Sequence, residues 1–219
     1  MENEISSKPA KPSLLGMIWS PTEQFDRIKQ NPKIWVPLLL VSLLFSFGMI
    51  LMAFTMDASF FELGDLSEEE TLLVLGFARI TMAITGIITP IITVLISSAI
   101  YLLICKIASS DVTFRQLFSM NTYILIIGAL GLVINSGFAA LIGGNSDVFI
   151  TSLAGLLNAG PSSILNHIEV FSIWQTILIA IGLNRVAGLS KTVAWIIAIV
   201  FFLVGIGLAL LSALAAPAM

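Results

Sequence analysis

The chain has 219 residues, of which 58% are hydrophobic and 11% charged, against about 25% charged in an ordinary soluble domain. A soluble globule of this length cannot bury so much apolar surface, and the mean hydropathy of +1.04 indicates a lipid environment. This composition excludes a soluble enzyme, a secreted disulfide scaffold and a disordered protein. The net charge is -3 and the ten Lys and Arg residues form no single stripe, so nucleic acid is not an expected partner.

The N-terminal segment divides into a tail and a short helix. Residues 1–12 are rich in Lys, Ser and Pro without apolar periodicity, which predicts a disordered tail. In residues 13–33, Ser20 and Glu23 have the spacing of a capping box, and a proline follows the serine at the first helical position. The pair Asn31-Pro ends this helix.

The predicted helix has an apolar face that includes Phe25 and Ile28. Such a face favours an interfacial helix lying on the cytoplasmic leaflet. The alternative is a helical overhang that packs against neighbouring loops. If the helix lies on the membrane surface, Phe25 and Ile28 are the candidate contacts to a partner.

Long uncharged runs predict an all-α, polytopic membrane domain in residues 34–219. A helix needs roughly 20 residues to cross about 30 Å of hydrocarbon, and four runs reach this length. The run 170–183 is shorter and makes a full span only if its helix begins near residue 163. The five predicted spans are residues 34–56, 80–105, 123–142, 163–183 and 193–214.

The segments between the spans carry weaker signals. Ser67 and Glu70 form a second capping box, so residues 68–79 either extend the second span outward or form a separate surface helix. The apolar stretch 148–157 is too short to cross and predicts an interfacial or re-entrant helix. Arg79 is expected to snorkel toward the outer interface.

Nine of the ten cations lie before the first span or in the second and fourth loops, while the odd loops contain only Arg79. Cationic loops stay on the cytoplasmic side. The N-terminus is therefore predicted to be cytoplasmic, and five spans place the C-terminus outside. We expect an uncleaved, multi-pass protein of the cell membrane.

The chain lacks the residues that common chemistries need. A single cysteine, Cys105, and a single histidine, His167, permit neither an internal disulfide nor a Cys/His zinc site. The five uncharged runs contain no intramembrane ionisable residue, which argues against proton-coupled transport and intramembrane proteolysis. We expect no catalytic, cofactor-binding or metal-binding residues.

Four polar residues lie in or near the spans. His167 and Glu169 form a possible acid/base pair, but two positions apart they point in different directions on a helix and are expected only to mark the interface. Asn135 and Gln175 lie at or near membrane depth, where interhelical hydrogen bonds would satisfy them.

The second span carries small hydroxyl side chains at a spacing of four residues, with a proline beside them. Such a stripe lets neighbouring helices approach and hydrogen-bond, so it is predicted to pack against other helices. A polar solute path along it is the alternative. The predicted packing residues are Thr81, Thr85, Thr89, Pro90, Thr93 and Ser97.

Three stretches resemble the Yip-domain family, five-span membrane proteins of the type that interacts with Rab GTPases, and its bacterial branch most of all. The likeness covers roughly residues 13–205. It implies a helical bundle with a cytoplasmic N-terminus and an outward C-terminus, and no enzymatic activity. The stretches are Ser20-Pro-Thr-Glu-Gln-Phe-Asp-Arg-Ile with Asn31-Pro32 and Pro37-Leu38; Phe114-Arg115-Gln116 leading to Tyr123; and Phe171-Ser-Ile-Trp-Gln-Thr-Ile-Leu with Gly182-Leu183 and Gly188-Leu-Ser-Lys.

Two functions stay open. The first is a non-catalytic scaffold or accessory factor for another membrane complex, because some bacterial relatives look like accessory subunits of ATP-driven exporters. The second is a permease-like protein that moves a small solute itself. The absence of buried charge and of paired repeats favours the scaffold. The expected partners are the lipid bilayer and a membrane protein or a second copy of the chain.

Overall fold

The fold is all-helical. The computed structural model describes residues 10–56, 66–142, 148–160 and 164–215, and the statements below concern these ranges. Within them the backbone forms helices and one isolated β-bridge, with no strand. The helices are α1 (Gly16–Trp19), α2 (Pro21–Gln30), α3 (Trp35–Phe54), α4 (Glu68–Ile107), α5 (Phe114–Ile142), α6 (Leu153–Leu157), the 3-10 turn η2 (Ile164–His167), α7 (Val170–Arg185) and α8 (Lys191–Ala215).

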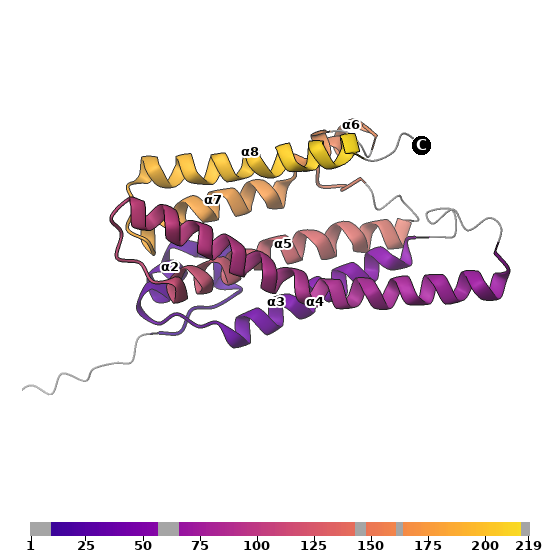
Figure 1. The fold of residues 1–219 in the computed structure, drawn as a ribbon, viewed down its shortest axis with the longest axis horizontal. Coiled ribbons are helices and arrows are strands. Elements are labelled where there is room, and N and C mark those ends of the chain that lie inside the picture. The colour runs from indigo at the N-terminus through magenta and orange to yellow at the C-terminus, as the bar shows by residue number, and fades with distance from the viewer. Residues whose placement is uncertain (1–9, 57–65, 143–147, 161–163, 216–219) are drawn as a thin grey trace, which may run out of the picture.

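The membrane helices follow the predicted order. In the described ranges α3, α4, α5 and α8 are long and apolar enough to cross a bilayer, and α7 is a shorter apolar helix of 16 residues. The predicted all-α membrane fold is confirmed, and a count of five spans fits these helices. The helices alternate in direction (Figure 1). The N-terminal segment and the loops that carry most cations therefore lie at one end of the bundle. We call this the basic end; it carries Lys11, Lys29, Lys33, Lys106, Arg115, Arg185 and Lys191.

The helices form two layers. α3 packs on α4 and α5, while α7 pairs with α8 and joins the first layer through α5 (Figure 1). The most deeply buried side chains cluster toward the basic end, where the N-terminal segment and the loops after α4 and α7 meet. This arrangement leaves wide apolar surfaces on α3, α4 and α8 for lipid or for partner helices.

The second span is one continuous helix of 40 residues. Ser67 and Glu70 form the predicted capping box, with the Glu70 backbone N–H donating to Ser67 Oγ at 3.3 Å and the Ser67 N–H donating to the Glu70 carboxylate at 2.9 Å. At 1.5 Å per residue α4 is about 60 Å long, twice the hydrocarbon thickness of about 30 Å. It therefore projects beyond α3 and α5 (Figure 1). Arg79 stacks over the Phe54 ring at the end of α3, 4.6 Å from its centroid.

The fourth membrane helix begins later than predicted. α7 starts at Val170 rather than near residue 163, because Glu169 caps it: the Ser172 N–H donates to the Glu169 carboxylate at 2.8 Å. Glu169 also bridges to Ser152 in extended backbone, which holds it outside the helix. The preceding residues form the separate turn η2, and part of the predicted extension, residues 161–163, lies outside the described residues.

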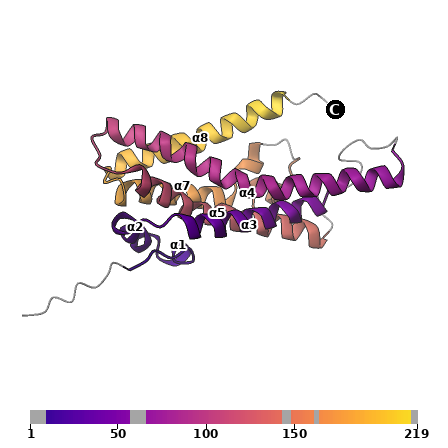
Figure 2. The same ribbon diagram turned by 60° about the horizontal axis from the view of Figure 1, so that its bottom comes forward.

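The N-terminal segment is a packed part of the bundle. Pro12 is buried and its carbonyl accepts a hydrogen bond from Tyr123 Oη at 3.1 Å, so ordered chain extends into the predicted tail. The rest of that tail, residues 1–9, lies outside the described residues. In place of one interfacial helix, α1 and α2 fold against the basic end and contact α5 and α7 (Figure 2). The overhang alternative describes α2 better, although it packs on helices instead of loops.

The predicted partner contacts of α2 point inward. Phe25 and Ile28 have no exposed surface and belong to the main core. A methyl group at Gly182 of α7 would lie 3.1 Å from Phe25 Cε1, so the Phe25 ring sits directly on α7. In this fold the bundle itself covers both side chains, so they are not available as the predicted partner contacts.

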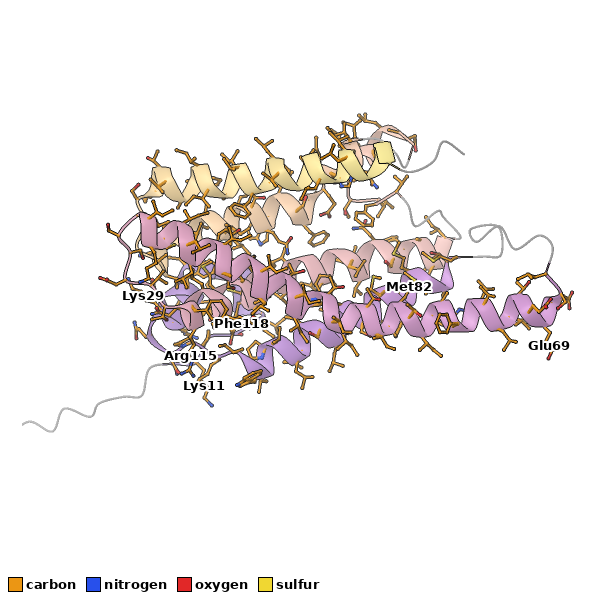
Figure 3. All side chains as sticks on the ribbon, viewed as in Figure 1. Lys11, Lys29, Glu69, Met82, Arg115 and Phe118 are labelled. Atoms are coloured by element: carbon orange, nitrogen blue, oxygen red, sulfur yellow. The ribbon has the colours of Figure 1, made fainter. Side chains whose placement is uncertain are left out.

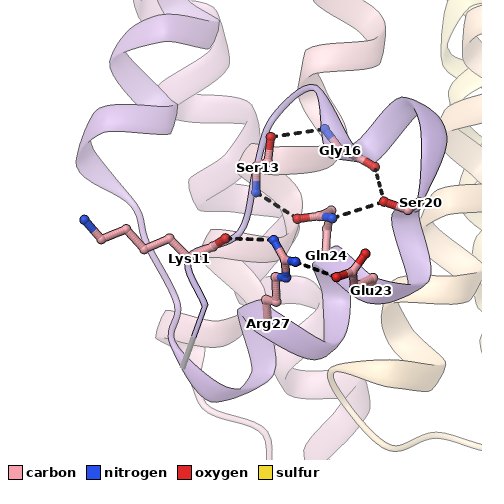
Figure 4. Close-up of polar contacts among 7 residues, drawn as sticks. All are labelled: Lys11, Ser13, Gly16, Ser20, Glu23, Gln24 and Arg27. Atoms are coloured by element: carbon pink, nitrogen blue, oxygen red, sulfur yellow. Dashed lines mark hydrogen bonds and ion pairs between the residues drawn. The ribbon is translucent and has the colours of Figure 1, made fainter. Parts of the chain in front are cut away.

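The start of α2 also differs from the predicted capping box. Ser20 Oγ donates to the Gly16 carbonyl at 3.4 Å and makes no bond to the α2 backbone. Glu23 pairs with Arg27 one turn along, and Arg27 also donates to the Lys11 carbonyl at 3.2 Å (Figure 4). The buried Gln24 side chain connects α2 to the chain before α1, because its amide oxygen accepts a hydrogen bond from the Ser13 N–H at 2.9 Å.

The topology has a direct test in single cysteines read by a membrane-impermeant thiol reagent on intact cells. In a Cys105→Ala background we expect labelling of Ser67→Cys, Ser146→Cys and Ala218→Cys. Ser7→Cys and Ser110→Cys lie on the side that the positive-inside rule assigns to the cytoplasm and should stay unlabelled. Labelling of Ser7→Cys and Ser110→Cys instead would show that the protein has the opposite orientation in the membrane.

Candidate functional site

The hydroxyl stripe of α4 faces outward. Thr81, Thr85, Thr89 and Thr93 are exposed, and Ser97 is half-buried. The buried face of α4 lies one position further along each turn and consists of Gly86, Pro90, Val94, Ser98, Tyr101 and Cys105. Of the predicted packing residues, Pro90 thus lies in the helix interface, and the four threonines are exposed within the described residues.

Within the described ranges the threonine hydroxyls lack hydrogen-bond partners. Ser97 Oγ donates to the Val94 carbonyl at 3.3 Å, but no hydrogen bond from the threonines Thr81, Thr85, Thr89 or Thr93 occurs within the described residues. Thr81, Thr85 and Thr89 therefore present unpaired hydroxyls on the exterior of a membrane helix, where a neighbouring helix could satisfy them. Thr93 and Ser97, further along α4, line a cavity within the bundle.

A cavity of about 470 Å³ lies between the two layers, bounded by α4, α5, α7, α8 and η2. The Tyr101 ring meets the Phe201 ring edge-on, with 4.8 Å between centroids, and links α4 to α8 beside the cavity. None of the described residues that line this space is Asp, Glu, Lys or Arg. Its polar wall is made by Thr93, Ser97, Asn121, His167, Ser172, Gln175 and Thr176.

Asn121 is a cavity residue that the sequence analysis missed. Its Nδ2 donates to Ser98 Oγ at 2.9 Å, and Ser98 Oγ donates to the Val94 carbonyl at 2.6 Å. The third span was predicted to begin at residue 123, whereas α5 begins at Phe114. The reciprocal hydrogen bonds of Thr113 and Gln116 mark this start, and their spacing is the signal that could have found it.

The pair His167 and Glu169 is separated by the fold. His167 lines the cavity, while Glu169 turns away and accepts from Thr151 Oγ1 at 2.7 Å. Thr151 in turn bonds Asn135, whose Nδ2 donates to Thr151 Oγ1 at 2.8 Å. Asn135 thus finds its partner in the connection between α5 and α6 rather than on another helix. Glu169 thus caps α7 and connects it to the segment before α6. Across the described ranges no three His, Cys, Asp or Glu side chains lie close enough together to hold a metal ion.

Gln175 lies between α7 and α5 as a packing residue. A methyl group at Gly128 would lie 2.5 Å from Gln175 Nε2, and one at Gly131 would lie 2.8 Å from the Phe171 ring. These glycines let α7 approach α5 closely, as small residues do in membrane interfaces. The predicted interhelical hydrogen bond of Gln175 is not among the contacts of the described residues.

These features define an all-helical, multi-pass integral protein of the cell membrane. Residues 15–214 match the Yip1 domain, and the chain belongs to that family. The chain is similar to "Membrane protein YknW" of Bacillus subtilis (strain 168), with 34% identity over 208 residues that cover 92% of this chain and 90% of the relative. No solved structure matches the chain. The resemblance drawn from the three sequence stretches is confirmed.

Proposed function

We propose that this protein is a non-catalytic scaffold or accessory factor that binds another membrane complex, such as an ATP-driven exporter. The observation that carries the proposal is the outward part of the threonine stripe of α4, from Thr81 to Thr89, with hydroxyls unpaired in the described chain. α4 is also the helix that projects from the bundle, and only 22% of its most apolar window is buried. A partner helix along this face would pair the hydroxyls and cover the apolar surface.

The proposal predicts that the stripe controls recovery of the partner complex. Thr85→Leu with Thr89→Leu removes two hydroxyls and adds bulk, and interhelical hydrogen bonds in membranes contribute about 0.6–2 kcal/mol each. We expect several-fold less of the complex to co-purify in mild detergent, measured by quantitative mass spectrometry against the wild type.

The matched control is Ile84→Leu with Ile88→Leu, on exposed positions one residue before each threonine. It preserves volume and should leave co-purification unchanged. Equal recovery with both double variants would contradict the proposal. Recovery of a second copy of the chain as the sole partner would place the stripe in a homo-oligomer and also contradict an accessory role.

The permease-like alternative rests on the cavity between the two layers, which is polar on α4, α5 and α7. Gly205 lines this cavity, whereas Gly207 does not, and a methyl group at either meets nothing within 4 Å. Gly205→Leu would therefore narrow the cavity, and Gly207→Leu is its control.

Osmotic shrinkage of vesicles containing only this protein separates the two functions. We expect glycerol and urea to enter no faster than in protein-free vesicles, as read by stopped-flow light scattering. Faster entry that Gly205→Leu abolishes and Gly207→Leu preserves would establish the permease and refute the scaffold.

A further inference from the structure

A second cavity, of about 780 Å³, lies at the basic end of the bundle. Three cationic side chains line it: Lys11 before α1, Lys33 in the linker from α2 to α3, and Arg115 in the first turn of α5. Figure 3 shows Lys11 and Arg115 at this end of the molecule. Among the described residues no carboxylate lines the cavity, so segments far apart in sequence converge on a wall whose charged side chains there are all cations.

The three cations have no counter-charge in the described chain. The ion pairs found there join Glu23 to Arg27 and Asp26 to Arg185, and neither involves a lining residue. Like charges around one space repel one another, and the repulsion grows where the membrane and protein exclude water. An anion in the cavity would convert this repulsion into attraction.

Backbone contacts hold the cationic segments in place while leaving the charged groups available. Ser119 Oγ of α5 donates to the Lys33 carbonyl at 2.7 Å, and Arg27 donates to the Lys11 carbonyl at 3.2 Å. Tyr123 Oη, whose residue also lines the cavity, donates to the Pro12 carbonyl. Because the main chain is anchored at Lys11 and Lys33, binding a ligand needs further ordering of side chains only.

The other wall of the cavity is apolar and lies where α3 begins. Ile34, Trp35 and Val36 line it at the start of α3, where the first span enters the apolar region. The Trp35 side chain is 81% exposed, as an aromatic residue at the headgroup level would be. A ligand that fits both walls carries an anion at one end and hydrocarbon at the other.

We propose that this cavity binds the headgroup phosphate of an anionic phospholipid, with Lys11, Lys33 and Arg115 around the phosphate and the acyl chains along Trp35. Basic pockets among membrane helices on the cytoplasmic side bind such headgroups. A free phosphate has the same anionic group, but it has no hydrocarbon that could pack against the apolar wall. The site is independent of the proposed partner, because it lies at the basic end and the threonine stripe runs along α4.

Native mass spectrometry of the full chain in detergent tests the assignment, with phosphatidylglycerol and phosphatidylcholine of identical acyl chains as probes. We expect the wild type to retain phosphatidylglycerol in preference to phosphatidylcholine. Lys33→Gln with Arg115→Gln should weaken phosphatidylglycerol binding about 25-fold, since each cation near an anionic lipid surface contributes roughly fivefold.

The matched control is Lys29→Gln with Lys106→Gln, which removes the same charge at the same end from side chains outside the cavity. It should bind phosphatidylglycerol like the wild type. Trp35→Ala keeps every charge and should weaken the binding of both lipids. It therefore tests the site independently if a thermal scan shows that the cationic variant is unfolded.

Equal retention of the two lipids by the wild type, or equal loss in the two charge variants, would overturn the proposal. Inorganic phosphate added at the lipid concentration distinguishes the two sources of the anion. We expect it to leave bound phosphatidylglycerol in place. Complete displacement would identify a free-phosphate site and refute the lipid assignment.

Discussion

Replacing Phe25 with alanine is expected to lower the free energy of unfolding by about 3–5 kcal/mol, the usual cost of removing a fully buried phenylalanine. Phe25 has no exposed surface, and its ring contacts Gly182 of α7. Met120 of α5 lies at the same point, where a methyl group at Gly182 would come 2.8 Å from its sulfur. The variant therefore opens a cavity where α2, α5 and α7 meet. A thermal scan of the purified protein in detergent measures the loss.

Trp19→Ala provides the control within the same segment. The Trp19 side chain is 78% exposed, so its removal deletes a large aromatic group with little effect on the packed core. We expect it to unfold near the wild-type temperature. An equally small effect of Phe25→Ala would mean that α2 does not pack on the bundle. It would favour the alternative in which α2 lies on the membrane surface and can contact a partner.

The spans were predictable because lipid imposes one strong requirement. A chain in hydrocarbon must satisfy its backbone internally, so long uncharged runs become helices. The helix ends depend on local contacts that hydropathy does not report. α7 begins at Val170 because Glu169 caps it and bridges to Ser152, and α5 begins well before its apolar run because Thr113 and Gln116 form a capping pair.

The direction in which a helix face points was not predictable from periodicity. In α4 the threonines and the series Gly86, Pro90, Val94 and Ser98 have the same four-residue spacing and lie side by side. Both series contain small residues, so either could form the close contact. The position of α3 decides between them, and that position depends on contacts between residues far apart in sequence. The same limit applies to α2, whose apolar face fits a membrane surface and a protein core equally well.

The crossing of α3 and α4 depends on Gly86. A methyl group there would lie 2.5 Å from Ser46 Cα and 2.9 Å from Ser46 N. These are backbone atoms, so no side-chain rotation can relieve the contact, and the helices must separate. Ser46 Oγ also donates to the Ala83 carbonyl at 2.9 Å across this crossing, a bond that separation would lengthen. Gly86→Ala is therefore expected to destabilise the bundle by about 1–3 kcal/mol, the usual cost of overpacking, or somewhat more because the clash is with main chain.

Gly76→Ala in the same helix separates this effect from helix propensity. A methyl group at Gly76 meets nothing within 4 Å, so the substitution adds the intrinsic preference of alanine for a helix, about 1 kcal/mol in water, without any clash. Gly86→Ala should thus lower the thermal unfolding midpoint in detergent, whereas Gly76→Ala should leave it unchanged or raise it. Equal shifts in the same direction would show that α3 and α4 are not in contact at Gly86. Because that contact fixes the outward orientation of the threonine stripe, the orientation would then also be refuted.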